Sequence, residues 1–298
     1  MSNYLSQIMD TALFKMTGFL VEGAAQVGEK FSGSLWSRML PPEDISANGH
    51  LIDWLFGYTT YMNIFFFALV CLGLFGFSYL YSAKKHPKPE YTYGNKKVHI
   101  TIATVIGAAV FFCIDSYIST KSSIDYTEVF INWPEEDKEP VERIEVMAQQ
   151  WAWNFRYAGK DGVFNTEDDV ITFNDLKVPT HKKVVFQVIS KDVIHALYLP
   201  NTRRKVDAIP GRITRMWIDF VKTGTFDLAC AEMCGTYHYR MQAKYTAMNE
   251  ADYNAWMKEA QERAFEDNDP EDPDLYWGWK WQPNLSKESR ERLSSTTL

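Results

Sequence analysis

Residues 57–83 carry no charged side chain, and this stretch limits what the chain can fold into more than any other part of it. Its centre, residues 64–77, is almost entirely apolar. About 20 apolar residues in a helix suffice to cross the hydrocarbon core of a bilayer. Trp54 and Tyr58 stand near the start of the stretch, and aromatic side chains of this kind are typical of a membrane interface. We therefore predict a membrane-spanning helix at about residues 58–83.

A second apolar run, residues 98–114, follows a basic connection and ends at Asp115. The connection holds five lysines that are opposed only by Glu90 (Lys84, Lys85, Lys88, Lys96 and Lys97). Lysine-rich loops beside membrane spans stay on the cytoplasmic side, so the N-terminus and everything after Asp115 are expected on the outer side. We predict a transmembrane hairpin over residues 57–118, with its second span at about 98–115. The alternative for the second run is a buried helix of a soluble domain.

The pattern changes after the hairpin. A polar linker is expected over residues 119–140, which end in a stretch rich in proline and acidic residues. Short β-type runs then recur, with Gly or Pro in the turns (143–148, 152–157, 184–189, 215–220 and 224–229). Short strands at such spacing favour a β-sandwich or a barrel. We place this all-β domain at residues 141–250.

The sequence says less about the structure of the two ends of the chain. In the N-terminal segment, residues 1–56, the stretch 11–27 fits an amphipathic helix on the membrane surface and an ordinary soluble helix equally well. It lacks a basic start followed by a clean apolar core, so no ordinary signal peptide is expected. Residues 251–298 are expected to complete a helix over 250–264, with Trp256 on its apolar face. An acidic and then an aromatic stretch follow, which either wrap a partner subunit or form a mobile extension.

Charge and cysteine usage narrow the class of protein. The net charge of −7 arises entirely after residue 118, where 30 acidic residues face 23 basic ones. An acidic domain argues against nucleic acid as a partner and favours a basic protein partner. Of the four cysteines, Cys71 and Cys113 lie in apolar runs and suit packing. Only Cys230 and Cys234 are placed for chemistry, so no disulfide framework is expected.

The segment 230–241 concentrates metal-binding side chains. It holds Cys230, Cys234, His238 and Met241, and His195 lies upstream in residues 192–200, after a strand-like run. Soft thiolate and thioether ligands together with imidazoles select copper. Two thiolates can bridge two copper ions, with one histidine on each, and Met241 and the backbone carbonyl of Glu232 as weak ligands. Structural zinc and a Cys230–Cys234 disulfide are the alternatives.

Metal ligands on loops at one end of a two-sheet sandwich are the cupredoxin design. The predicted fold class is therefore a two-helix transmembrane hairpin plus an all-β cupredoxin-like sandwich domain. Two coppers that share two sulfurs can delocalise one electron with little change of geometry, which suits electron transfer.

The pattern Cys-x-Glu-x-Cys-Gly-x-x-His-x-x-Met resembles the dinuclear copper (CuA) loop of subunit II of haem-copper cytochrome c oxidases. The resemblance covers about residues 45–260. It implies that the copper pair accepts electrons from cytochrome c and passes them to haem in subunit I, which reduces oxygen to water with proton translocation. The implied setting is the inner membrane of a bacterium, with the copper domain outside. No Cys-x-x-Cys-His occurs, so haem is expected in partner subunits only, and the donor is a cytochrome c or a c-type cytochrome subunit.

The resemblance also implies roles for residues outside the copper loop. Trp151 maps onto the family's electron-receiving tryptophan, although the family usually has tyrosine where Ala152 stands here. Trp153 is predicted to lie in the sandwich core. The family's magnesium ion at the subunit I interface would bind the Glu232 side chain, with Asp207 acting through water, whereas ordinary surface ion pairs are the alternative for both.

Three further expectations concern Asp207 with Arg212, His99, and residues 161–169. The family's aspartate and arginine near this interface map onto Asp207 and Arg212. His99 lies where the family commonly has a glutamate at the mouth of a proton path, and it is either a proton acceptor or an interfacial histidine. Residues 161–169 contain the side chains of a calcium loop without EF-hand spacing, so a hairpin turn with exposed acids is preferred. Those acids could also attract a basic cytochrome c.

Two alternatives for the function remain from the sequence. One is a copper-loop component of a nitric or nitrous oxide reductase. The other is a membrane-anchored copper-binding assembly protein.

Overall fold

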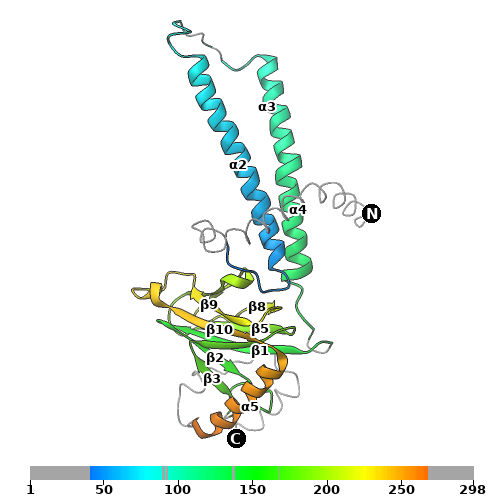
Figure 1. The fold of residues 1–298 in the computed structure, drawn as a ribbon, viewed down its shortest axis with the longest axis vertical. Coiled ribbons are helices and arrows are strands. Elements are labelled where there is room, and N and C mark those ends of the chain that lie inside the picture. The colour runs from blue at the N-terminus through cyan, green and yellow to red at the C-terminus, as the bar shows by residue number, and fades with distance from the viewer. Residues whose placement is uncertain (1–40, 89–90, 92, 136–137, 167, 268–298) are drawn as a thin grey trace. The chain divides into compact units, whose positions relative to one another are not determined.

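A computed structural model describes residues 41–88, 91, 93–135, 138–166 and 168–267, and its chain divides into two compact units. One unit contains the helical residues 50–132, and the other contains residues 41–49 together with the chain from Trp133 onward. The N-terminal stretch 11–27, expected to be either a membrane-surface helix or a soluble helix, and the predicted tail after 267 lie outside the described residues. Figure 1 shows the helices and strands of both units.

The helical unit contains two helices that are long and apolar enough to cross a membrane. The first is α2 (Gly49–Leu80), and the second runs without a break over residues 97–130. The second helix contains α3 (Lys97–Val110), the π-helical turn η1 (Phe111–Asp115), α4 (Ser116–Asp125) and the π-helical turn η2 (Tyr126–Phe130). Apolar side chains along both helices are exposed, as expected for surfaces that face lipid.

The first helix begins before its predicted membrane span, and the second continues beyond its predicted span. The second helix continues through residues 116–130, of which 119–130 were assigned to the polar linker, because hydropathy marks only the apolar part of a helix. An ion pair between Lys121 and Asp125, one turn apart, supports the polar part. The first helix begins at Gly49 instead of about residue 58. There the Gly49 N–H donates a hydrogen bond of 3.0 Å to the Ser46 hydroxyl, which satisfies an N–H group at the helix start.

The second unit is a pair of five-stranded sheets among the described residues. One sheet has the order β3-β2-β1-β5-β8 and the other has the order β4-β10-β9-β6-β7. The strands of the first sheet are β1 (Val141–Gln149), β2 (Ala152–Tyr157), β3 (Val170–Phe173), β5 (Lys183–Ser190) and β8 (Thr214–Asp219). Those of the second are β4 (Asp175–Pro179), β6 (His195–Leu199), β7 (Arg204–Ala208), β9 (Gly224–Cys230) and β10 (Gln242–Met248).

A single apolar core holds the sheets together. Fully buried side chains from both sheets meet in it, among them Trp153, Phe186, Leu197 and Tyr245. The β-sandwich prediction is thereby confirmed, as is the core position of Trp153. The five predicted strand ranges correspond to β1, β2, β5, β8 and β9. Strands β3, β4, β7 and β10 were not predicted, and for β7 the reason is that its sequence, RKVDA, is mostly charged.

The segment before the first helix belongs to this second unit, although the sequence placed it in the N-terminal segment. Ile45 is fully buried. Its N–H donates to the Asn201 carbonyl (2.9 Å), and its carbonyl accepts from the Val221 N–H (2.8 Å).

At the C-terminal end of the described chain, helix α5 (Glu250–Asp267) follows β10, and Trp256 packs against Tyr157 with ring centroids 5.2 Å apart. The predicted helix and its apolar face are confirmed.

The loop between β2 and β3 corrects one prediction. A hairpin turn was expected at residues 161–169 and is present, but two of its acids, Asp168 and Asp169, are buried instead of exposed. Asp168 accepts from the Lys160 N–H (2.6 Å), and Asp169 accepts from the Asn165 N–H (2.7 Å). Asp169 also pairs with the buried Arg156 at 3.4 Å. These two carboxylates therefore hold the loop together and do not contribute to an acidic surface.

Candidate metal centre

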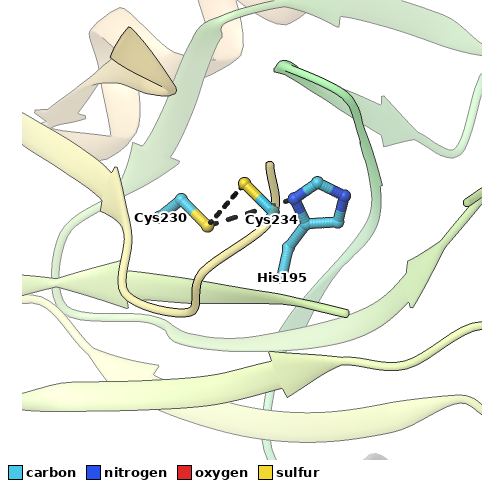
Figure 2. A group of neighbouring side chains, drawn as sticks. All are labelled: His195, Cys230 and Cys234. Atoms are coloured by element: carbon cyan, nitrogen blue, oxygen red, sulfur yellow. Dashed lines mark hydrogen bonds between the residues drawn. The ribbon is translucent and has the colours of Figure 1, made fainter. Parts of the chain in front are cut away.

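The candidate ligands gather where β9 runs into β10. Cys230 is the last residue of β9, and Met241 directly precedes β10. The Cys230 N–H donates to the Met241 carbonyl at 3.1 Å, which closes the base of the loop. His195 begins β6, the neighbour of β9, and is fully buried. Figure 2 shows its ring facing the two cysteine sulfurs.

The two cysteines are free, buried thiols whose sulfurs lie 3.7 Å apart. The ligand atoms of His195, Cys230 and Cys234 all lie within 4.8 Å of one another. His195 Nδ1 is 4.0 Å from Cys230 Sγ, and His238 Nδ1 is 3.5 Å from Cys234 Sγ. Both imidazoles therefore present the same ring nitrogen to a sulfur, which suits one histidine on each of two ions.

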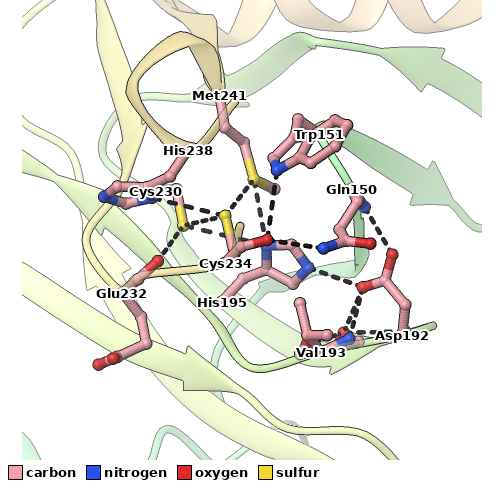
Figure 3. Close-up of polar contacts among 11 residues, drawn as sticks. Gln150, Trp151, Asp192, Val193, His195, Cys230, Glu232, Cys234, His238 and Met241 are labelled. Atoms are coloured by element: carbon pink, nitrogen blue, oxygen red, sulfur yellow. Dashed lines mark hydrogen bonds and ion pairs between the residues drawn. The ribbon is translucent and has the colours of Figure 1, made fainter. Parts of the chain in front are cut away.

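Two weaker donors complete the set. Met241 is buried, with its Sδ atom 3.1 Å from His195 Nδ1 and 3.7 Å from Cys234 Sγ. The Glu232 carbonyl oxygen is 3.1 Å from Cys230 Sγ. Figure 3 shows the side chains of the other five predicted ligands and the Glu232 carbonyl oxygen around one small volume, with the Glu232 carboxylate pointing away from it. A buried thioether among thiolates and imidazoles fits copper, whereas zinc takes thiolate, imidazole and carboxylate ligands.

The cysteine thiols have very different acidities. Burial opposes ionisation of Cys230, but hydrogen bonds from His195 and neighbouring backbone groups outweigh it and lower its pKa to about 6. Burial, together with the nearby Cys230 sulfur, raises the pKa of Cys234 to about 12. Two thiolates this close repel each other, so the loop is suited to a site where cations neutralise both.

His195 is held on its other side by a carboxylate. Its Nε2 lies 2.8 Å from Asp192 Oδ1, which leaves Nδ1 to face the sulfurs. Burial alone would lower the pKa of His195, but hydrogen bonds with Cys230 and Asp192 raise it overall. Asp192 was missed in the sequence. A signal was available, because a metal-binding histidine usually donates its second N–H to a carboxylate or carbonyl, and Asp192 stands three residues before His195.

Trp151 lies against the ligand loop, in the turn between β1 and β2. Its Nε1–H donates to the Cys234 carbonyl at 3.2 Å. The indole is partly buried, and Tyr237 packs edge-on against it with ring centroids 4.8 Å apart. Tyr237 is 46% exposed, so two aromatic side chains mark this surface of the loop. The sequence did not identify Tyr237.

Several apolar side chains around the centre are exposed. Met233 and Tyr239 of the loop are 74% and 65% exposed, and Ile194 beside His195 is 48% exposed. Residues 141–248 contain 15 lysines and arginines against 12 acidic residues, so the excess acids lie in 119–140 and after 248. The acidic character expected for the metal-binding domain therefore belongs to its flanking segments.

The predicted magnesium residues lie on the adjacent strands. Asp207 on β7 and the backbone at Ala231 are both paired with Ala196 of β6. Asp207 forms an ion pair of 2.8 Å with Lys205, while Glu232 is exposed. The hydrogen bond with Asp207 raises the pKa of Lys205, and the Glu232 charge adds to the shift. Arg212 is exposed in the turn before β8.

Two sheets, a buried Cys-Cys-His group and two candidate membrane helices define a membrane-anchored cupredoxin-type domain. Residues 143–248 match the family model described as cytochrome c oxidase subunit II, periplasmic domain. The alternative cytochrome c oxidase subunit 2 of Bradyrhizobium diazoefficiens is 32% identical over 239 residues, which cover 72% of this chain and 82% of that protein. The chain therefore belongs to the cytochrome c oxidase subunit II family.

Further relatives share this family. Cytochrome c oxidase subunit 2 of Alkalihalophilus pseudofirmus is 28% identical over 221 residues, which cover 72% of this chain and 60% of that protein. The solved periplasmic domain of subunit II of cytochrome oxidase from Bradyrhizobium japonicum is 28% identical, covering 42% of this chain and 96% of that domain, with a TM-score of 0.37.

Family membership decides between the functions that the sequence left open. Members of the cytochrome c oxidase subunit II family are components of an oxidoreductase complex, so the chain is assigned to such a complex. The family and the His-Cys-Cys group together indicate a copper-binding domain. The two apolar helices and the match to a periplasmic domain indicate a membrane anchor with an outward-facing domain.

Proposed function

We propose that the loop 230–241 holds two copper ions and that the chain receives electrons there from a cytochrome c or a c-type cytochrome subunit. The single observation that carries the proposal is the pair of free cysteine sulfurs 3.7 Å apart with an imidazole Nδ1 beside each. A copper pair bound by two shared thiolates supplies one-electron transfer with little change of geometry. How electrons enter and leave the copper pair depends on how this chain's residues hold and shield it.

The contacts suggest how the ligands are divided. The Met241 sulfur lies next to His195 Nδ1, so these two side chains suit the same ion. His238 and the Glu232 carbonyl would then hold the other ion, and the Cys230 and Cys234 thiolates would be shared by both. Glu232 would contribute only its backbone carbonyl to copper, so its side-chain carboxylate stays available for a second ion. We assign that carboxylate to a magnesium ion at the interface with subunit I, with Asp207 in contact through water, because Mg²⁺ prefers carboxylate oxygens and keeps most of its waters.

Trp151 is the proposed electron-receiving residue. Its indole N–H reaches the carbonyl of Cys234, which gives a short path of bonds from the aromatic ring to a bridging sulfur. The exposed apolar side chains around it suit contact with the apolar rim of a haem protein. Electrons then pass to haem in subunit I, where oxygen is reduced to water with proton translocation. We place the chain in the inner membrane of a bacterium with its β domain outside.

Single cysteine substitutions test the assignment. In the purified oxidase, Cys230→Ser and Cys234→Ser should each abolish the near-infrared absorbance of the pair, because either change removes a bridge. Cys113→Ser, which removes an exposed thiol of the helical unit, is the control and should keep the absorbance. Retention of two coppers with wild-type absorbance in either loop variant would contradict the bridging assignment.

A further inference from the structure

One carboxylate, that of Asp192, contacts both the His195 ligand and the segment that carries Trp151. Its Oδ1 atom accepts from His195 Nε2 at 2.8 Å, and its Oδ2 atom accepts from the Gln150 backbone N–H at 2.7 Å. The two oxygens therefore serve different parts of the chain, β6 and the turn between β1 and β2. Figure 3 shows the carboxylate between them.

The Gln150–Trp151 segment is in turn fastened to the ligand loop. Gln150 Nε2 and Trp151 Nε1 both donate to the Cys234 carbonyl, at 2.8 Å and 3.2 Å. The contacts thus run from His195 through Asp192 and Gln150 to Cys234. A bridging ligand, a terminal ligand and the proposed electron-receiving side chain share one set of hydrogen bonds.

We propose that Asp192 is a positioning residue with two effects: its charge sets the donor strength of His195, and its second oxygen holds the Gln150–Trp151 segment against Cys234. This inference rests on the proposed function. An imidazole that donates its second N–H to a carboxylate keeps one tautomer and is a stronger metal ligand. A negative charge next to the ligand also favours the more positive, oxidised state of the centre, so it lowers the reduction potential.

A purely local role for Asp192 makes a different prediction. Asp192 Oδ1 also accepts from the Val193 N–H at 2.6 Å, as a turn-forming aspartate does. Asparagine would fill such a role equally well, since its single oxygen still accepts. It cannot accept from both His195 and Gln150, because its second atom is an N–H donor. The substitution Asp192→Asn therefore separates the two interpretations.

The experiment uses the assembled oxidase, titrated potentiometrically and then mixed with reduced soluble cytochrome c. Asp192→Asn should weaken copper binding roughly 10- to 100-fold, as loss of such outer contacts does elsewhere. If the oxidised state is weakened about tenfold more than the reduced state, the reduction potential rises by about 59 mV. The higher potential alone would speed electron transfer from cytochrome c. The proposal predicts slower transfer instead, because Trp151 is no longer held in place.

The matched control is Asp175→Asn, which removes a half-exposed carboxylate that pairs with Lys177 on β4. It should leave both the potential and the rate at wild-type values. An unchanged potential in Asp192→Asn, or a rate that rises with the driving force, would overturn the proposal. Absence of a copper pair in the wild-type protein would instead refute the proposed function itself.

A second variant keeps the test decisive if Asp192→Asn does not assemble. Gln150→Met retains the backbone N–H that Asp192 accepts but loses the side-chain bond to the Cys234 carbonyl. It should slow electron transfer from cytochrome c at an unchanged potential. A wild-type rate in this variant would overturn the claim that the segment needs to be held.

Discussion

Gly235, the residue after the second cysteine, is a position where one added methyl group should damage the centre. Its backbone φ is +116°, a conformation that residues with a side chain rarely adopt. A Cβ atom there would lie 2.8 Å from Gln150 Nε2 and 3.3 Å from Trp151 Cζ2. Gly235→Ala therefore combines backbone strain with a clash against the two side chains that donate to the Cys234 carbonyl.

The magnitude follows from these two costs. Holding alanine in such a backbone conformation costs about 1–3 kcal/mol. The clash is relieved when Gln150 and Trp151 move away, which breaks two hydrogen bonds worth about 0.5–1.5 kcal/mol each. The sum is about 2–6 kcal/mol. Since about 1.4 kcal/mol is a factor of ten, even the lower end predicts a loss of copper affinity of roughly 30-fold.

Gly162→Ala is the matched control. Gly162 also has a positive φ, +69°, but nothing lies within 4 Å of its added Cβ. It should show backbone strain without a clash and keep full copper content. The assay is copper per chain in the purified oxidase, together with the temperature at which the near-infrared absorbance is lost. Equal copper content and equal thermal shifts in the two variants would refute the steric argument.

Three further predictions follow from other residues. Trp151→Phe should slow reduction by cytochrome c while the copper spectrum stays intact, and stopped-flow kinetics at wild-type rates would remove Trp151 as the electron-receiving residue. Glu232→Gln should abolish binding of Mn²⁺, a spectroscopic substitute for Mg²⁺, and leave the copper spectrum unchanged, because copper uses only the backbone carbonyl. Burial raises the pKa of Glu145 from 4.5 to about 8, with Arg156 partly offsetting it. The folded state therefore binds a proton that the unfolded state releases above its pKa, so stability should fall as pH rises from about 4.5 to 8, by up to about 1.4 kcal/mol per pH unit. Glu145→Gln should reduce this dependence and leave the part that arises from Asp169, whose pKa burial raises to about 7. An unchanged slope in thermal unfolding of the β domain would contradict the assignment.

The structure brings the predicted ligand residues together, and the sequence could indicate them because most of them lie in one short segment. Five of the six candidate ligand residues lie within residues 230–241, and only a few metals take that set of donors. The first membrane helix was predictable for a similar reason, because residues 57–83 carry no charged side chain and so long an uncharged run has few alternatives. His195 is the exception, because it lies 35 residues before Cys230 in the sequence. It was identified from the family pattern. The structure brings it to 4.0 Å from Cys230 because β6 pairs with β9.

What the sequence did not reveal depends on long-range contacts. The burial of Ile45 follows from its hydrogen bonds to Asn201 and Val221, more than 150 residues away. Asp169 was expected at the surface, yet Arg156 draws it inside. Gln150 gave no local signal, because its role depends on the Cys234 carbonyl reaching it from the opposite sheet.

The most direct test of the central claim is the number and electronic state of the metal ions in the wild-type β domain of the intact oxidase. Elemental analysis combined with electron paramagnetic resonance measures both. Two coppers for each copy of this chain, with one unpaired electron coupled equally to both nuclei, is the predicted result. A single ion, a silent zinc, or a Cys230–Cys234 disulfide in the active enzyme would contradict the account.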